Sequence, residues 1–144
     1  MVDVGDKPAT RRTGKARAFV VLSEEVLSKL PENPKGNPLE IARIAGIQAA
    51  KKTSELIPLC HPLPLSHADV DVKVESDGVE IVASATTTGQ TGVEMDAMTA
   101  ASVAALTVYD MCKALDKSIE ISQLCLLEKT GGKNGDFRRQ PGTN

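Results

Sequence analysis

The chain has 144 residues, a length typical of one domain that can bury a substantial core. Its 41% hydrophobic and 25% charged residues are ordinary for a globular protein, and a net charge of −2 argues against a general nucleic-acid or membrane surface. Aromatic residues make up only 2%, which predicts an aliphatic core and argues against base stacking as a binding mode.

The cysteines indicate a reducing compartment. Cys60, Cys112 and Cys125 are irregularly spaced and form no C-x-x-C pair, so they predict reduced thiols and no structural zinc site. The polar N-terminus has no signal-peptide pattern, and no apolar stretch approaches the length of a membrane span. We therefore expect a cytoplasmic protein.

The first half of the chain predicts an arm, a strand and two helical pieces. Residues 1–14 contain turn formers and charges and predict a flexible N-terminal arm. A strand is expected over 16–22, followed by a short helical turn over 24–30 with Ser23 as its N-cap. A longer helix from 39 to about 52 follows the N-cap Asn37 and Pro38, and places Ile41 and Ile44 on one face.

A β-hairpin is predicted next. Valine and alanine alternate with polar residues over 68–75, and Asp77-Gly78 is a strong signal for a two-residue turn. Pairing about that turn sets Val74 opposite Ile81 and keeps all apolar residues on one face.

The remaining elements complete a β-α-β-β-α-β order. A long helix is expected from the N-cap Asp96 to about Leu115, and a strand over 118–128 with a bulge near Gln123. The predicted buried face of the helix consists of Met98, Ala101, Ala105, Val108, Cys112 and Leu115.

This order predicts an α+β fold, the ferredoxin-like α/β plait, with an antiparallel sheet and helices on one face. Residues 15–129 would form a single domain, and residues 130–144 a flexible tail rich in Gly and Lys. The uncovered sheet face and the strand edges favour an oligomer.

The segment 56–65 is a first candidate for a site. Three prolines exclude a regular helix and hold His61 on a stiff mount among leucines, as a small-molecule site requires. A loop that enters a strand, with a histidine at the edge of the core, is an equally good interpretation of this segment alone.

Charged residues give further candidates. Asp110 and Lys113 are three positions apart on the long helix and could tune each other for acid–base work, although a surface ion pair is the commoner meaning of that spacing. Glu94 could accept hydrogen bonds from a polar heterocycle. Lys35, Lys129 and Lys133 lie beside glycines and are candidate phosphate ligands or solvated loop charges.

Several long blocks together resemble one family. They are Ala42–Lys51 (A-R-I-A-G-I-Q-A-A-K), Leu56–Pro62 (L-I-P-L-C-H-P), Thr91–Met95 (T-G-V-E-M), Leu106–Lys113 (L-T-V-Y-D-M-C-K) and Lys129–Lys133 (K-T-G-G-K), and the similarity runs from Met1-Val-Asp-Val4 to Phe137. In these blocks the chain is similar to the family of molybdenum cofactor biosynthesis protein C, the cyclic pyranopterin monophosphate synthases.

The resemblance implies a ferredoxin-like lyase that converts 3′,8-cyclo-7,8-dihydroguanosine 5′-triphosphate into cyclic pyranopterin monophosphate and releases diphosphate. It implies a homohexamer, a trimer of dimers with sites at the dimer interface, and no cofactor, with Mg²⁺ left open. By motif, Asp110, Lys113 and Lys35 are catalytic. The residues implied to bind substrate are Leu59, Cys60, His61, Glu94, Met95, Asp96, Lys129 and Lys133, and Asp96 stands where relatives often carry Glu.

Two other functions fit the fold. One is a non-catalytic regulatory module that binds a small molecule, because this fold hosts many such domains, and the other is a structural scaffold subunit. The enzyme hypothesis requires that folding and subunit docking bring His61 and the Asp110–Lys113 pair to a common cavity. The two rival functions require no such convergence.

Overall fold

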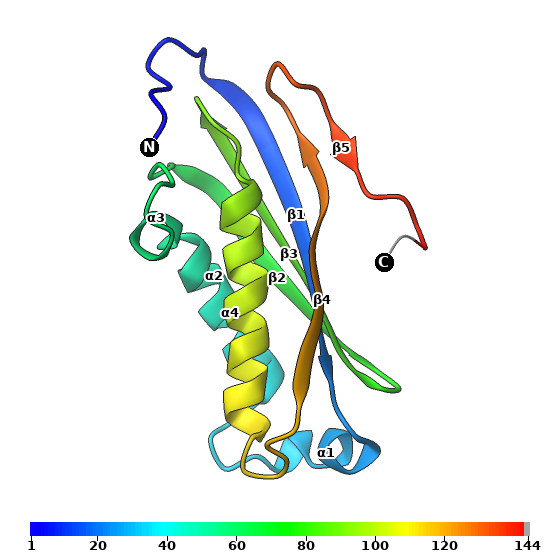
Figure 1. The fold of residues 1–144 in the computed structure, drawn as a ribbon. Coiled ribbons are helices and arrows are strands. Elements are labelled where there is room, and N and C mark those ends of the chain that lie inside the picture. Colours follow the sequence, from blue (N-terminus) through cyan, green and yellow to red (C-terminus); the bar gives the residue numbers. More distant parts are fainter. Residues whose placement is uncertain (143–144) are drawn as a thin grey trace.

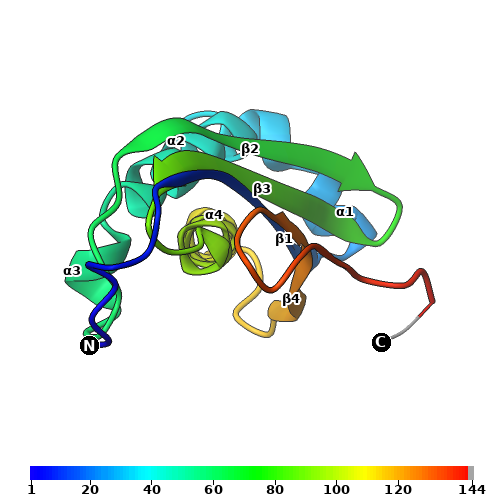
Figure 2. The ribbon, with the colours of Figure 1, turned by 90° about the horizontal axis from the view of Figure 1, so that it is seen from above.

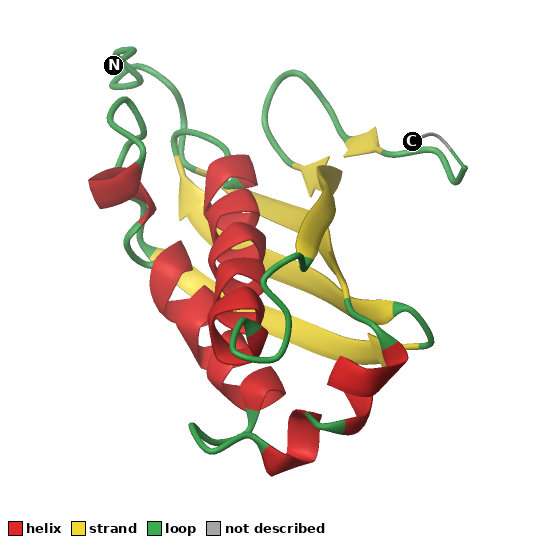
Figure 3. Cartoon of the chain, turned by 60° about the horizontal axis from the view of Figure 1, so that its bottom comes forward, coloured by secondary structure: helices red, strands yellow, loops and turns green. Residues whose placement is uncertain are grey.

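A computed structural model describes residues 1–142. One antiparallel sheet with the strand order β2-β3-β1-β4-β5 carries its helices on a single face (Figure 1, Figure 3). The elements are β1 (Thr10–Val21), α1 (Glu24–Ser28), η1 (Leu30–Glu32), α2 (Pro38–Ala50), α3 (Thr53–Leu56), β2 (Leu65–Glu75), β3 (Gly78–Gly89), α4 (Glu94–Cys112), β4 (Glu120–Thr130) and β5 (Phe137–Arg138). The predicted ferredoxin-like α+β fold is confirmed.

The sheet extends further at both chain ends than the sequence predicts. β1 begins at Thr10, because residues 10–14 pair with the end of β3. Thr13 and Gly14 also pair with β4, so only residues 1–9 precede the sheet. At the other end, Thr130 belongs to β4, and Phe137 and Arg138 pair with that strand as β5. Residues 10–14 of the predicted arm and residues 130, 137 and 138 of the predicted tail therefore belong to the sheet, and residues 143–144 of the predicted tail lie outside the described residues.

The hairpin has the predicted faces but a different register. Val74 pairs with Val79 and not with Ile81, because Ser76 and Asp77 form the turn and Gly78 already belongs to β3. Gly78 is required there for another reason: a Cβ would lie 2.1 Å from Val20 O on β1. A shift of two residues keeps every side chain on its predicted face.

The core is built from small side chains between β1, β3 and the two long helices. α2 and α4 approach closely at Gly46, where a Cβ would lie 2.9 Å from Ala100 O. This contact buries Ala42 and Gly46 and leaves Ile41 and Ile44 on the exposed face of α2. On α4 the predicted buried face is confirmed at Ala101, Ala105, Val108 and Cys112, Met98 is partly buried, and Leu115 beyond the helix end is 50% exposed.

The helix ends follow local chemistry. Ser23 and Asn37 cap α1 and α2 as predicted, since their side chains accept hydrogen bonds from Val26 N and from Leu39 N. The N-cap of α4 is Val93, three residues before the predicted N-cap Asp96, so the assignment of Asp96 as N-cap is wrong. Gln123 adopts φ 56° at a register shift in β4, which confirms the predicted bulge.

Candidate active site

Lys35, Asp110 and Lys113 form a carboxylate–lysine cluster. Asp110 Oδ1 lies 2.9 Å from Lys113 Nζ, and its Oδ2 lies 3.4 Å from Lys35 Nζ. Asp110 and Lys113 come from the last turn of α4, and Lys35 reaches them from the loop between η1 and α2. One carboxylate thus lies between two cations.

The two lysines stabilise the ionised form of Asp110. The hydrogen bond and charge of Lys113, followed by the charge of Lys35, hold the pKa of Asp110 below its usual value. In return, the hydrogen bond and charge of Asp110 raise the pKa of Lys113. Lys113 is therefore protonated at neutral pH and is suited to donate a proton or to stabilise negative charge.

A hollow of about 300 Å³ lies beside this cluster. All three members of the cluster line it, together with apolar walls from Met111 and Leu115. The C-terminal end of a helix also favours cations, which supports the placement of both lysines. The hollow can accept an anionic group next to a proton donor.

The other predicted site residues gather in a histidine pocket of about 310 Å³. Leu59, Cys60, His61, Glu94, Met95 and Asp96 all line it. The structure thus brings together the two motifs that contribute to it, although more than thirty positions separate them in the chain.

Local structure fixes both motifs. After α3, Cys60 N donates to Ile57 O in a turn, and Pro64 O accepts from Thr87 Oγ1 on β3, so both ends of the proline segment are anchored. Glu94 opens α4 and folds back over Gly92, where a Cβ would lie 2.2 Å from Glu94 Oε1. A side chain at position 92 would displace the carboxylate.

Asp96 is the buried acid of the histidine pocket, with 6% of its surface exposed. Burial raises its pKa to about 6, although hydrogen bonds from its own backbone and from Thr53 partly offset this. Burial and the charge of Asp96 also raise the pKa of the Cys60 thiol. Cys60 is therefore a neutral thiol at neutral pH and not an activated nucleophile.

The N-terminal segment completes the pocket, which the sequence did not predict. Val2, Val4 and Lys7 line it, and His61 Nε2 lies 2.7 Å from Val2 O. Because a carbonyl only accepts, Nε2 carries a hydrogen, which leaves Nδ1 as the ring nitrogen that faces away from Val2 O and can accept when it carries no hydrogen. The only sequence signal for this role was the Met1–Val4 block of the family resemblance.

The two predicted tail lysines lie outside both cavities. Lys129 pairs with Gly14 across β1 and β4, and Lys133 is exposed in the turn between β4 and β5. Gly14 packs against Val93 O, so Lys129 lies on the helix-covered face near the start of α4. Lys129 therefore lies near the end of α4 that contributes to the histidine pocket, whereas Lys133 lies in the exposed turn that follows β4.

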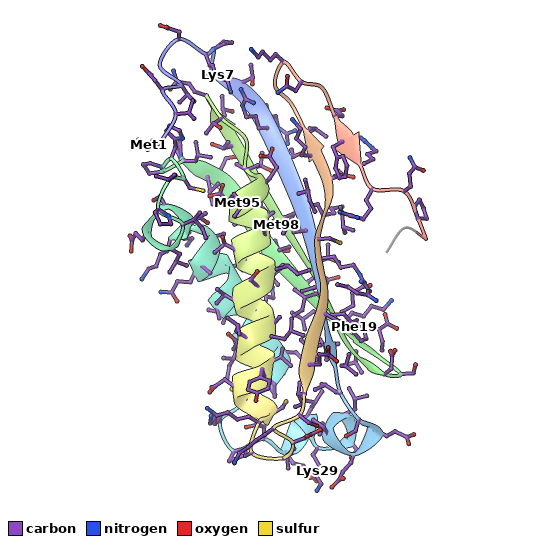
Figure 4. The ribbon with its side chains drawn as sticks, in the orientation of Figure 1. Met1, Lys7, Phe19, Lys29, Met95 and Met98 are labelled. Atoms are coloured by element: carbon purple, nitrogen blue, oxygen red, sulfur yellow. The ribbon has the colours of Figure 1, made fainter. Side chains whose placement is uncertain are left out.

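Within one chain the two groups of residues lie at opposite ends of α4. Glu94 and Asp110 are separated by sixteen residues of helix, about 24 Å along its axis. Figure 4 shows Met1, Lys7 and Met95 at one end and Lys29, which lines the hollow beside Asp110, at the other. Figure 2 shows the N-terminal segment running beside α3 at the first end. A single chain does not bring His61 and Lys113 to a common cavity.

Across residues 1–142, no group of three or more His, Cys, Asp and Glu side chains is arranged to hold a metal ion. No helix in the same range has both the length and the apolar character needed to cross a bilayer.

Comparison with known proteins identifies the family. A model described as the MoaC family matches residues 1–132. A cyclic pyranopterin monophosphate synthase of Chloroflexus aurantiacus is 54% identical over 143 residues, which cover 96% of this chain and 88% of that protein. Proteins of the same name from Bacillus velezensis and Peptoclostridium acidaminophilum are 54% and 48% identical and cover 96% and 97% of this chain, with 85% and 90% of their own lengths.

The family match extends from the N-terminal segment to the end of β4, so it includes every residue that lines the histidine pocket or the hollow beside the carboxylate–lysine cluster. The chain belongs to the MoaC family.

Proposed function

We propose that this protein is a cyclic pyranopterin monophosphate synthase that acts in molybdenum cofactor biosynthesis. It converts 3′,8-cyclo-7,8-dihydroguanosine 5′-triphosphate into cyclic pyranopterin monophosphate and releases diphosphate, which makes it a phosphorus–oxygen lyase. Family membership and the names of its relatives support the reaction. The observation that carries the proposal is the convergence of Lys35, Asp110 and Lys113 from two distant segments.

The chemistry requires proton transfers and charge neutralisation. Opening the purine-derived ring and rebuilding it as a pterin needs an acid and a base at fixed positions. When a ring hydroxyl attacks the α-phosphorus, the bond to the leaving diphosphate breaks and negative charge develops on its oxygens. Lys113 starts protonated and serves as the acid, and Lys35 exchanges the second proton. Asp110 contacts both amines and so orients them, and it raises the pKa of Lys113.

The histidine pocket holds the substrate. His61 Nδ1 and the Glu94 carboxylate are acceptors that suit the donor edge of a guanine-derived ring. Cys60, Met95 and Leu59 supply apolar wall, and Asp96 supports the pocket from below the surface. Lys129 and Lys133 are the cations proposed to reach the phosphates.

Two chains complete each site in this proposal. Docking two subunits with α4 helices antiparallel would bring the histidine pocket of one chain to the carboxylate–lysine cluster of the other. Exposed apolar side chains, including Ile44 at 53% and Leu106 at 57%, support burial against another subunit. A homohexamer built as a trimer of dimers accommodates this arrangement, and the three free cysteines fit a cytoplasmic location.

Diphosphate release tests the proposed function. Purified protein incubated with the cyclic nucleotide triphosphate should release diphosphate, and Lys113→Met should abolish this release. Lys73→Met is the matched control, since Lys73 also pairs with a carboxylate, 3.6 Å away at Glu75, but lies on the hairpin and lines neither cavity. Binding of the nucleotide without diphosphate release would instead favour the non-catalytic regulatory module.

A further inference from the structure

The side chain of Asn33 attaches the loop that carries Lys35 to α4, in addition to the contacts that Lys35 itself makes with Asp110. Asn33 Nδ2 donates to Met111 O at 2.6 Å, across 78 positions of sequence. Met111 lies in the last turn of α4, where carbonyls lack partners within the helix. Asn33 therefore supplies a donor to the helix end that also carries Asp110.

The other end of the same amide shapes the loop. Asn33 Oδ1 accepts from Lys35 N at 2.9 Å, and the backbone oxygen of Asn33 accepts from Gly36 N at 3.1 Å. Gly36 adopts φ +117°, a conformation that other residues rarely adopt, and so lets the chain turn immediately after Lys35. These bonds fix the backbone of Lys35 relative to Asn33.

The orientation of the amide follows from its partners. A backbone N–H only donates and a carbonyl only accepts, so a flipped Asn33 amide would lose both of its side-chain hydrogen bonds. An aspartate at this position would keep the bond to Lys35 N but lose the donor to Met111 O. The arrangement thus uses both functions of an amide.

These hydrogen bonds determine where the amine of Lys35 lies. Lys35 is half-exposed and has a long flexible side chain, so its Nζ would have many alternatives in water. With the loop attached to α4, Nζ lies 3.4 Å from Asp110 Oδ2 and 3.5 Å from Asp110 O. Both contacts are to Asp110, the residue next to Met111, and the Met111 carbonyl accepts the hydrogen bond from Asn33.

We propose that Asn33 is a positioning residue that holds Lys35 in the carboxylate–lysine cluster by joining the Lys35 loop to the last turn of α4. This inference rests on the proposed function only for its kinetic consequences, because the position of Lys35 can be measured without turnover. Asn33 itself need not touch the substrate.

The experiment compares Asn33→Ala, Lys35→Met and the double variant. Asn33→Ala should lower kcat by about 10- to 100-fold, as misplaced catalytic groups do. The double variant should be no slower than Lys35→Met, because Asn33 acts only through Lys35. In the substrate-free protein, an NMR titration should show the pKa of Asp110 rising in Asn33→Ala by the same amount as in Lys35→Met, because Lys35 lowers that pKa.

Asn37→Ala is the matched control. Asn37 lies in the same loop and also bonds to backbone groups, but its side chain caps α2 by accepting hydrogen bonds from Leu39 N and Glu40 N. Its removal should lower Tm by a few degrees and leave both kcat and the Asp110 titration within experimental error. If Asn33 only stabilised the fold, Asn33→Ala would behave like Asn37→Ala, with a lower Tm but an unchanged kcat and an unchanged Asp110 titration.

The outcomes separate the two proposals. Asn33→Ala with wild-type kcat, an additive loss in the double variant, or an unchanged Asp110 pKa would each overturn the positioning role. Wild-type turnover in Lys35→Met would instead refute the proposed catalytic role of Lys35, and the Asp110 titration would still decide whether Asn33 positions it.

Discussion

Replacing Asp96 with Asn should make the stability of the protein less dependent on pH. The carboxyl group of Asp96 is buried at the start of α4, and its pKa is raised from 3.8 to about 6, first by burial. A raised pKa means that the folded state binds more protons than the unfolded state between these two values. The free energy of unfolding therefore falls as pH rises through this window.

The magnitude follows from the shift. The difference between 3.8 and about 6 corresponds to about 3 kcal/mol of unfolding free energy that is present below the unfolded-state pKa and lost above pH 6. Asn has a similar shape and no charge, so Asp96→Asn avoids this loss. Relative to wild type, the variant should gain most of this 3 kcal/mol on going from about pH 4 to about pH 7.5.

Urea unfolding at a series of pH values measures this difference. Protein concentration must be equal throughout, because association of subunits would add to the apparent stability. Asp116→Asn is the control of opposite sign: hydrogen bonds from Ser118 lower the pKa of Asp116, so its contribution is lost as pH falls through that lowered value. If the difference in unfolding free energy between wild type and Asp96→Asn stayed constant with pH, Asp96 would not be a buried carboxylate whose charge destabilises the fold.

Two further predictions concern the cluster and the hairpin. Asp110→Asn should lower the pKa of Lys113, because Asp110 raises it in the wild-type protein. A ¹⁵N NMR titration of the Lys113 amine measures this pKa, and an unchanged value would show that Asp110 does not raise it. Gly78→Ala should destabilise the fold by about 2–4 kcal/mol, because the new Cβ would lie 2.1 Å from Val20 O. Thermal unfolding measures this loss, with Gly135→Ala as the comparison, since a Cβ at Gly135 meets nothing within 4 Å but φ is +75°. The larger loss of stability shows whether the close approach or the strain of a positive φ matters more.

Patterns with a fixed period allowed most of the fold to be predicted. Alternation over β2 and β3 determined which side chains face the core, and the capping chemistry of Asn37 gave the start of α2. The register of the hairpin was wrong by two residues because Gly78 suggested a turn, whereas it is required for the approach of β1. That requirement depends on tertiary packing, which a local signal does not contain.

The candidate site was predictable where the residues lie on one element and less so where elements meet. The Asp110–Lys113 pair follows from helical spacing, whereas the approach of Lys35 depends on Asn33 and a loop turn. Asp96 looked like an N-cap because it precedes an apolar run, but the helix starts earlier and the side chain is buried. The contact between Val2 O and His61 Nε2 was not predictable, because it depends on the path that the N-terminal segment takes in the folded chain.

The most direct test of the central claim mixes two inactive variants. His61→Ala removes the imidazole of the histidine pocket and Lys113→Met removes the proton donor of the carboxylate–lysine cluster, and each alone should be inactive. If every site combines the two groups from different chains, half of the randomly reassembled dimers contain both variants, and one of their two sites is intact. Co-refolding in equal amounts should then restore about a quarter of wild-type diphosphate release. No activity in a mixture that contains mixed dimers, verified by mass spectrometry, would contradict the shared site.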